Sequence, residues 1–175
     1  MRILLLLFIA GRLLFMTQCD KGECIGQSIL DFNDIPRIAS LTPLDTIFTQ
    51  GSIINFSVTV PSTNTYFGDP VNMLEESGDS LASLVLYNDY FEGNTYNFIK
   101  GSQQEGPFSE VFFMPYNADT QNYEFEMEIT LDQVGDYSIP SQADIEIGLG
   151  DCPDFFVTTF FEGVEGNVID FRVVE

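Results

Sequence analysis

The clearest pattern along the chain is a strict alternation of hydrophobic and polar residues over 123–131. The hydrophobic positions are Tyr123, Phe125, Met127, Ile129 and Leu131, and the polar positions between them are Glu124, Glu126, Glu128 and Thr130. Because successive side chains of a β-strand point to opposite faces, this run predicts a strand with one buried face and one face in water. Shorter apolar or alternating runs predict strands over 53–60, 84–87, 96–99, 110–114, 143–147, 155–161 and 168–174.

The spacing of these runs indicates the fold class. Turn-forming residues lie between them, Pro115 is expected to end the strand over 110–114, and no stretch of ten residues keeps a helical period. Residues 74–86 leave room for one short helix. We therefore predict an all-β protein, an antiparallel immunoglobulin-like Greek-key β-sandwich of about seven to nine strands. The length of 175 residues favours a single sandwich domain, over 29–175, behind an N-terminal segment.

Three residues directly after the clearest strand resemble the tyrosine corner of Greek-key sandwiches. Leu131 would end the strand facing inward, Gly135 would supply a sharp or left-handed turn, and Tyr137 would donate its hydroxyl to backbone a few residues upstream. The alternative is an ordinary hairpin loop that contains a core tyrosine. The corner interpretation predicts a structural role for Tyr137.

Residues 1–18 have the pattern of an export signal. Arg2 supplies a positive charge, and apolar residues fill 3–10 and 13–16. This segment of about 14 residues is too short for a stable transmembrane helix, and it suits the hydrophobic region of a signal peptide. Residues 19–28 are mostly polar and include two glycines, so we expect them to form a tether ahead of the sandwich.

The three cysteines fit an exported, lipid-anchored chain. Residues 16–19 resemble a bacterial lipobox, in which the cysteine, here Cys19, becomes the lipidated first residue of the mature protein. The alternative is cleavage elsewhere, with Cys19 as a free thiol or a disulfide partner. Lipidation of Cys19 leaves Cys24 and Cys152 as an even pair, which an oxidising compartment would let form a disulfide. Two separate buried thiols are the alternative for this pair.

The composition excludes several classes of function. The chain has 27 acidic residues against six Lys plus Arg, a formal net charge of −21, and neither His nor Trp. Binding to a nucleic-acid backbone needs clustered positive charge, so we expect no nucleic-acid partner. Without histidine, Ser-His-Asp triads and histidine ligation of metals are ruled out. We expect no cofactor, no metal and no catalytic residues, and the acidic side chains are interpreted as solvated turn and strand positions.

Two stretches are candidates for contact with a partner. Residues 63–80 form the longest segment without a predicted strand, and long loops usually carry function. Its candidate binding residues are Tyr66, Phe67, Asp69, Glu75, Glu76 and Asp79. The phenylalanine pairs at 155–156 and 160–161 place aromatic side chains on both faces of one predicted strand. They fit a central strand packed on both sides, or a contact surface for a partner.

The chain resembles the immunoglobulin-like exported lipoproteins of Bacteroidota-type bacteria. The resemblance depends on the lipobox-like residues 16–19, on 49–52 leading into the strand over 53–60, on the corner over 131–137, and on Cys24 with Cys152. It implies a chain tethered by an N-terminal lipid to the outer membrane or cell surface. Because the sequence has no histidine, no activated nucleophile and no phosphate-binding loop, we expect a non-catalytic binding or adhesion module with an unknown extracellular protein or glycan as partner. The alternative is a lipoprotein enzyme that uses paired carboxylates on an extracellular glycan.

Overall fold

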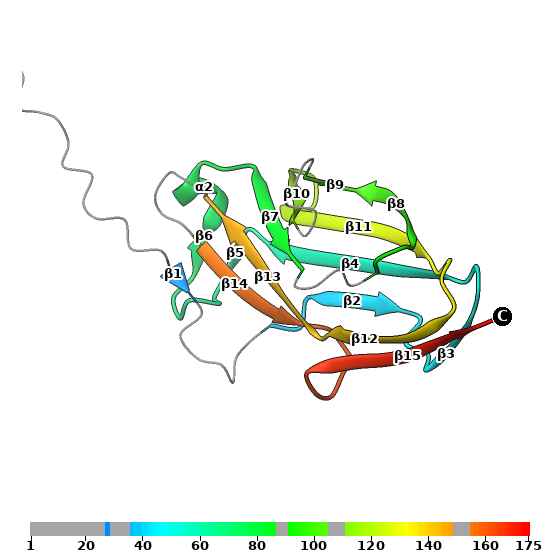
Figure 1. The fold of residues 1–175 in the computed structure, drawn as a ribbon. Helices are drawn as coiled ribbons and strands as arrows, with labels where there is room; N and C mark the ends of the chain where they lie inside the picture. Colours follow the sequence, from blue (N-terminus) through cyan, green and yellow to red (C-terminus); the bar gives the residue numbers. More distant parts are fainter. Residues whose placement is uncertain (1–26, 29–35, 87–90, 105–110, 149–154) are drawn as a thin grey trace, which may run out of the picture.

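The computed structural model describes residues 27–28, 36–86, 91–104, 111–148 and 155–175, and most of its regular structure is β-strand (Figure 1). Two largely antiparallel sheets form the main layers. The first sheet has the order β1 (Gln27–Ser28), β14 (Phe155–Phe160), β13 (Gln142–Ile147), β7 (Leu81–Val85), β10 (Val111–Asn117) and β9 (Ser102–Gln103). The second sheet has the order β2 (Ala39–Thr42), β4 (Ile53–Pro61), β11 (Asn122–Thr130) and β8 (Thr95–Lys100).

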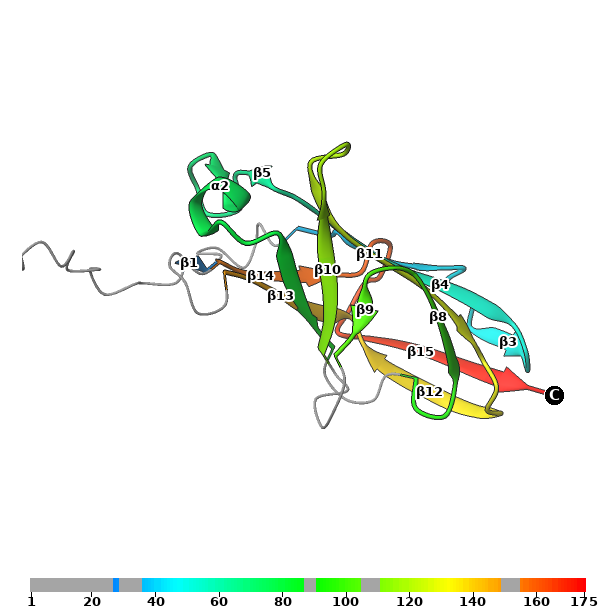
Figure 2. The ribbon, with the colours of Figure 1, turned by 90° about the horizontal axis from the view of Figure 1, so that it is seen from above.

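The two sheets are joined along both edges (Figure 2). On one side, β10 and β11 form a hairpin that pairs only at its closed end, Tyr116 with Tyr123 and Asn117 with Asn122. On the other side, Ala39 of β2 forms a parallel bridge with Phe161, directly after β14. The sandwich therefore closes almost into a barrel. The predicted fold class is confirmed, and nine of the described strands contain five or more residues.

Two smaller units extend the sandwich at opposite ends (Figure 1). A third sheet, at the end that carries the C-terminus, has the order β12 (Gly135–Pro140), β15 (Val168–Val174) and β3 (Ile47–Thr49). β12 runs on into β13 through the buried Ser141, whose hydroxyl donates to the carbonyl of Gly166 at 2.6 Å. At the other end lie the short hairpin β5 (Thr63–Asn64) and β6 (Val71–Asn72) and the helix α2 (Met73–Ser77).

The core lies between the inner faces of the first and second sheets. β4 and β11 pair over nine residues and bury the hydrophobic positions that the alternation predicted. Aromatic rings cross the interior: Phe56 of β4 lies 5.5 Å from Phe161, and Phe125 of β11 lies 5.3 Å from Phe112 of β10, between ring centroids. Burial of each large apolar side chain contributes about 1.5–3 kcal/mol, so these contacts hold the two layers together.

A bend at Gly101 lets one stretch of chain pair with both sheets. β8, before the bend, pairs with β11, and β9, after it, pairs with β10. A Cβ atom on Gly101 would lie 2.3 Å from the backbone oxygen of Phe113 and 2.7 Å from the Phe125 ring. The φ angle of Gly101 is +86°, which L side chains rarely adopt. The crossing between the layers therefore requires glycine.

Pro115 does not end its strand, as the sequence had suggested, because β10 continues to Asn117. The amide of Tyr116 donates toward β7, to the carbonyl of Ser80, so the nitrogen of Pro115 faces the opposite side of the strand. On that side β9 pairs only with residues 112–113 and β11 only with residues 116–117. The missing N–H thus falls in a gap of the ladder, where proline is tolerated.

The strand β14 is not packed on both faces along its length. It lies between β13 and the two-residue strand β1, next to the edge of the first sheet. Phe155 and Phe161 are buried, whereas Phe156 is 40% exposed on the outer face of the sheet. The two aromatic pairs therefore divide between the core and the surface.

The crossing at Gly101 provides a stability test. Gly101→Ala is expected to lower the free energy of unfolding by about 2–4 kcal/mol, because it adds a steric conflict with Phe113 and Phe125 to the strain of a positive φ. Urea denaturation of the purified protein measures this change.

The matched control is Gly51→Ala. Gly51 has a similar φ of +83°, but no atom lies within 4 Å of the Cβ it would gain, so only the strain of about 1–2 kcal/mol should appear. Equal losses in the two variants would show that the close approach at Gly101 is not required.

Candidate functional site

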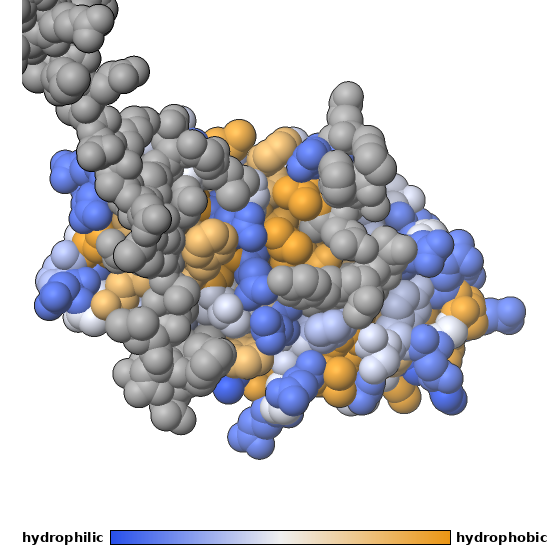
Figure 3. All heavy atoms as spheres, turned by 60° about the vertical axis from the view of Figure 1, so that its left-hand side comes forward, coloured by the Kyte–Doolittle hydropathy of each residue, from blue (hydrophilic) through white to orange (hydrophobic). Residues whose placement is uncertain are grey.

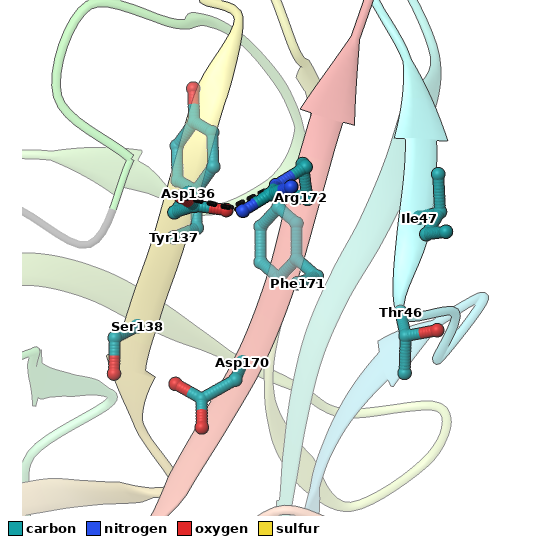
Figure 4. Close-up of a pocket in the computed structure, with 8 residues that line it drawn as sticks. All are labelled: Thr46, Ile47, Asp136, Tyr137, Ser138, Asp170, Phe171 and Arg172. Carbon is teal, nitrogen blue, oxygen red and sulfur yellow. Dashed lines mark hydrogen bonds and ion pairs between the residues drawn. The ribbon is translucent and has the colours of Figure 1, made fainter.

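A shallow hollow of about 530 Å³ lies on the third sheet (Figure 4). Eight residues from β3, β12, β15 and the residue before β3 line it: Thr46, Ile47, Asp136, Tyr137, Ser138, Asp170, Phe171 and Arg172. The strand register sets Asp136 opposite Arg172 and Ser138 opposite Asp170. Alternation along each strand places these four polar side chains on the outer face, while Tyr137 and Phe171 point toward the interior.

An ion pair dominates the electrostatics of this hollow. Two guanidinium nitrogens of Arg172 donate to the Asp136 carboxylate: Nε to Oδ1, and Nη2 to Oδ2 at 3.0 Å. The guanidinium hydrogen bonds hold the pKa of Asp136 below its usual value and raise the pKa of Arg172. Both side chains are largely exposed, so water screens the pair and its contribution to stability is small.

The hollow brings two carboxylates, Asp136 and Asp170, to one face, and a pair of carboxylates is one of the features that a glycoside hydrolase needs. Such an enzyme also needs one carboxyl with a raised pKa, in a site that excludes water, to donate a proton. Asp136 has the opposite shift, and the hollow is open. The acidic and hydroxyl groups that line the hollow are suited to binding cationic or polar groups.

The hydrogen bond of a tyrosine corner is present beside this hollow. The Tyr137 hydroxyl donates to the backbone oxygen of Gln133 at 2.9 Å, and its ring stacks on Phe171 at 4.8 Å between centroids. Leu131 follows β11 and is fully buried. Gly135 begins β12 with a φ of +156°, which L side chains rarely adopt, so the position favours glycine, although this φ lies far from the left-handed helical value.

Asn94, which the sequence analysis did not select, connects the corner to the β8 side of the sandwich. Its side-chain oxygen accepts hydrogen bonds from the amides of Asp132 and Gln133, and its side-chain nitrogen donates to the Tyr137 hydroxyl at 3.1 Å. Asp132 accepts a further bond from Thr95. The contact joins residues 38–43 positions apart, and no local sequence signal marks such a pairing.

The predicted binding loop, residues 63–80, is a folded unit. Asn72 caps α2 by accepting from the amide of Glu75, and Gly78 ends the helix at φ +71°. The aromatic residues Tyr66 and Phe67 pack against the core, with Phe67 5.3 Å from Phe155 between ring centroids. Burial raises the pKa of Tyr66.

The acidic residues of this unit divide into two groups. Asp69, Glu75 and Glu76 are exposed. Asp79 is half-buried, and its backbone carbonyl accepts a hydrogen bond from the Tyr123 hydroxyl at 2.6 Å. Burial raises the pKa of Tyr123 to about 12. The unit therefore carries three solvent-exposed carboxylates, and its aromatic side chains anchor it to the core.

Glu124 was predicted to lie on the wet face of its strand, but it is only 7% exposed. Thr120 donates to Oε1 at 2.6 Å, and Asn117 and Lys100 contact Oε2 at 3.2 and 3.0 Å. These hydrogen bonds, that of Thr120 foremost, hold the pKa of Glu124 below its usual value. A second shallow hollow, of about 400 Å³, lies beside this network.

Cys19, Cys24 and Cys152 lie outside the described residues, so lipidation and the disulfide stay predictions. Within the part of the chain that the structure describes, no helix is long and apolar enough to cross a membrane. The same residues contain no group of three or more acidic or cysteine side chains placed to hold a metal ion.

The corner predicts a measurable role for the Tyr137 hydroxyl. Tyr137→Phe is expected to lower the free energy of unfolding by about 1–3 kcal/mol, because the carbonyl of Gln133 and the side chain of Asn94 lose a partner. Tyr116→Phe is the control, since the Tyr116 hydroxyl has no hydrogen bond within the described residues. An unchanged urea midpoint for Tyr137→Phe would contradict the structural role.

The Glu124 network predicts a pH-dependent stability. A carboxyl whose pKa is lowered by folding stabilises the protein above its unfolded pKa, and this stabilisation is lost as the pH falls through the lower folded value. Glu124→Gln should therefore lower the free energy of unfolding by about 1–2 kcal/mol at pH 7, and the difference from wild type should shrink below about pH 4.5. Urea denaturation between pH 3 and 7 tests this, with the exposed Glu162→Gln as control. A difference that is constant with pH would refute it.

Comparisons with known proteins give limited information. No protein-family model matches the sequence, and a search of curated proteins finds no match. The fold is similar to AggA, the major subunit of aggregative adherence fimbriae type I from Escherichia coli, with a TM-score of 0.40 and 10% identity over 81% of this chain and 97% of that one. It is also similar to the bacterial hydrophobin BslA, with a TM-score of 0.34 and 12% identity over 78% of this chain and 96% of that one. These likenesses are too distant to carry an argument about function.

Proposed function

We propose that the chain is a non-catalytic binding module, exported and tethered by a lipid on Cys19 to the outer membrane or cell surface. The observation that carries the proposal is the protonation state that the fold favours for its acidic side chains. Among the described residues, two carboxyls have shifted pKa values, Glu124 and Asp136, and both are held in the ionised form by partners in the same chain. Ionised carboxylates of this kind stabilise the fold or bind a partner, whereas an acid catalyst needs a carboxyl whose pKa is raised.

The end unit of residues 63–80 is the proposed binding element. Its helix and hairpin are fixed by the core contacts of Tyr66 and Phe67, so the exposed Asp69, Glu75 and Glu76 are held on a rigid base. A preorganised surface loses little conformational entropy when it binds. The carboxylates favour a partner with cationic or hydroxyl groups.

The second candidate is an enzyme that acts on an extracellular glycan. It is favoured by one observation, the presence of Asp136 and Asp170 in one hollow. In that case substitution of Asp170 alone, by Asn, would abolish turnover of a glycan substrate. The binding proposal expects no turnover from the wild-type chain.

Two measurements test the proposal. In cells fed labelled palmitate, wild type should be labelled and found at the surface, whereas Cys19→Ala should not be labelled. Crosslinking from intact cells should then capture a partner whose yield falls several-fold when Asp69→Asn, Glu75→Gln and Glu76→Gln are combined.

The matched control combines Glu92→Gln, Glu162→Gln and Glu165→Gln, which removes three exposed carboxylates elsewhere. Equal loss of the partner in both triple variants would show that net charge, and not the end unit, governs binding. Glycan turnover that Asp170→Asn abolishes would overturn the proposal in favour of the enzyme.

A further inference from the structure

Three side chains from three strands meet at the point where β8 and β10 leave β11. Lys100 is the last residue of β8, directly before the bend at Gly101, and Asn117 is the last residue of β10. Glu124 lies on β11, which pairs with both strands. The Glu124 Oε2 atom contacts Lys100 Nζ at 3.0 Å and accepts a hydrogen bond from Asn117 Nδ2 at 3.2 Å. A primary amine and a primary amide are therefore held on the same carboxylate oxygen.

The carboxylate of Glu124 is enclosed by the fold. On the side of the molecule that Figure 3 brings forward, hydrophilic side chains form a surface band between apolar areas. In contrast, only 9% of the Glu124 side chain is exposed, although 47% of the Lys100 side chain is. Thr120 holds the other carboxylate oxygen by donating to Oε1 at 2.6 Å. The carboxylate is thus fixed in place, while the flexible stem of the lysine beside it can still move.

The side-chain amide of Asn117 is oriented for attack at its carbon. The backbone N–H of Asp119 donates to Asn117 Oδ1 at 3.0 Å. A fixed donor at a carbonyl oxygen stabilises the negative charge that develops there when a nucleophile adds to the carbon. The amide nitrogen, which would leave, donates to Glu124. Lys100, Asn117 and Glu124 all line the hollow of about 400 Å³ described above, so the amine and the amide share one space.

We propose that Lys100 and Asn117 form an intramolecular isopeptide bond and that Glu124 transfers the protons. The bond would join the Lys100 Nζ atom to the Asn117 Cγ atom and release one molecule of ammonia. The reaction is a single event within the folded chain, and its balance requires no oxidant and no second substrate. It goes beyond the binding role proposed above and does not depend on it, because the bond concerns the strength of the fold.

Each step keeps atoms and charges in balance. Glu124 first takes a proton from the Lys100 ammonium group along the 3.0 Å contact, which leaves a neutral amine beside a carboxylic acid. The amine nitrogen then adds to the Asn117 Cγ atom, and the amide oxygen gains negative charge opposite the N–H of Asp119. The carboxylic acid gives its proton to Nδ2, and the resulting carboxylate removes the surplus proton from Nζ. The Cγ–Nδ2 bond breaks, the carbonyl forms again, and ammonia leaves as ammonium with the proton that Glu124 then holds.

The protonation state of the pair sets the rate. The hydrogen bond to Glu124 raises the pKa of Lys100, and Glu126, 3.6 Å from Nζ, acts in the same direction. The bonds from Thr120 and Lys100 lower the pKa of Glu124, and Tyr116 of β10 lines the same hollow. The neutral amine is therefore a minor state at pH 7, so we expect the bond to form over hours to days and faster as the pH rises. Orientation offsets this cost, because well-placed intramolecular groups reach effective concentrations of about 10⁵–10⁸ M.

The bond would reinforce a junction where strand pairing is interrupted. β10 and β11 pair there over only two residues, and β8 ends at Lys100 before the chain crosses to the other sheet. A covalent link from the end of β8 to the end of β10 would hold both strands beside β11. A crosslink also restricts the unfolded chain, so the linked protein should unfold at a higher urea concentration than the unlinked protein.

The test follows the intact mass of the full purified chain during several days at pH 9. The mass should fall by that of one ammonia molecule, and more slowly at pH 7. Trypsin cleaves after lysine and arginine, and Lys100 is the only such residue between Arg37 and Arg172. Trypsin added after denaturation should therefore cut the unlinked chain at residue 100 and leave residues 38–172 of the linked chain as one peptide.

Lys100→Arg is the decisive variant, because its guanidinium keeps a positive charge beside Glu124 but stays protonated. This variant should keep its full mass. The matched control is Lys21→Arg, which replaces the other lysine of the sequence and should lose ammonia as wild type does. Glu124→Gln should slow the loss at least tenfold. Wild type kept in concentrated urea should not lose ammonia, since unfolding separates the two groups.

Three outcomes would overturn the proposal. An unchanged mass with complete cleavage after Lys100 would show that no bond forms. A small gain in mass, from hydrolysis of the Asn117 amide to a carboxylate, would show that water attacks that carbon in place of the amine. Loss of ammonia that persists in Lys100→Arg would assign the chemistry to other residues. The binding role is tested separately, by partner capture, and stands or falls without the bond.

Discussion

The pairing of β4 with β11 is the interaction on which the rest of the structure depends. Their nine paired residues give the second sheet its two central strands, and their inner side chains are almost completely buried. Every neighbouring element uses one of these strands as an edge: β2 adds to β4, while β8 and β10 share the free edge of β11. Three glutamates lie along the outer side of β11, and their mutual repulsion is offset by this burial and by the contacts of Lys100 with Glu124 and Glu126.

The pairing of β4 with β11 also determines where the buried polar contacts of the fold form. Because β10 and β11 separate after two paired residues, space opens for the strand that crosses at Gly101, and this crossing brings Lys100 to Glu124. Beyond the other end of β11, the chain turns into β12, where the Tyr137 hydroxyl and Asn94 satisfy the turn backbone. The described cations are thus used in contacts within the fold.

The sequence predicted the long strands well, because β4, β11 and β15 alternate along almost their whole length. It missed β2, β3 and β12, which are short or follow directly from a corner, so that no alternating run identifies them. It misplaced Glu124 and Pro115, since burial of the one and tolerance of the other depend on contacts with neighbouring strands, which the local pattern of one strand does not reveal. The importance of Asn94 likewise depends on a contact about 40 residues away.

A failure of alternation can be as informative as its presence. Residues 81–86 and 111–115 contain apolar residues in consecutive positions, which sequence reasoning interprets as strands covered on both faces, as in a parallel sheet between helices. The described chain has only the five-residue helix α2, which contacts β6 at the end of the sandwich. Leu81 and Phe156 stay partly exposed, so the apolar pattern exceeds what the core requires. Consecutive apolar residues therefore identify these strands correctly, but they do not establish that both faces of each strand are covered.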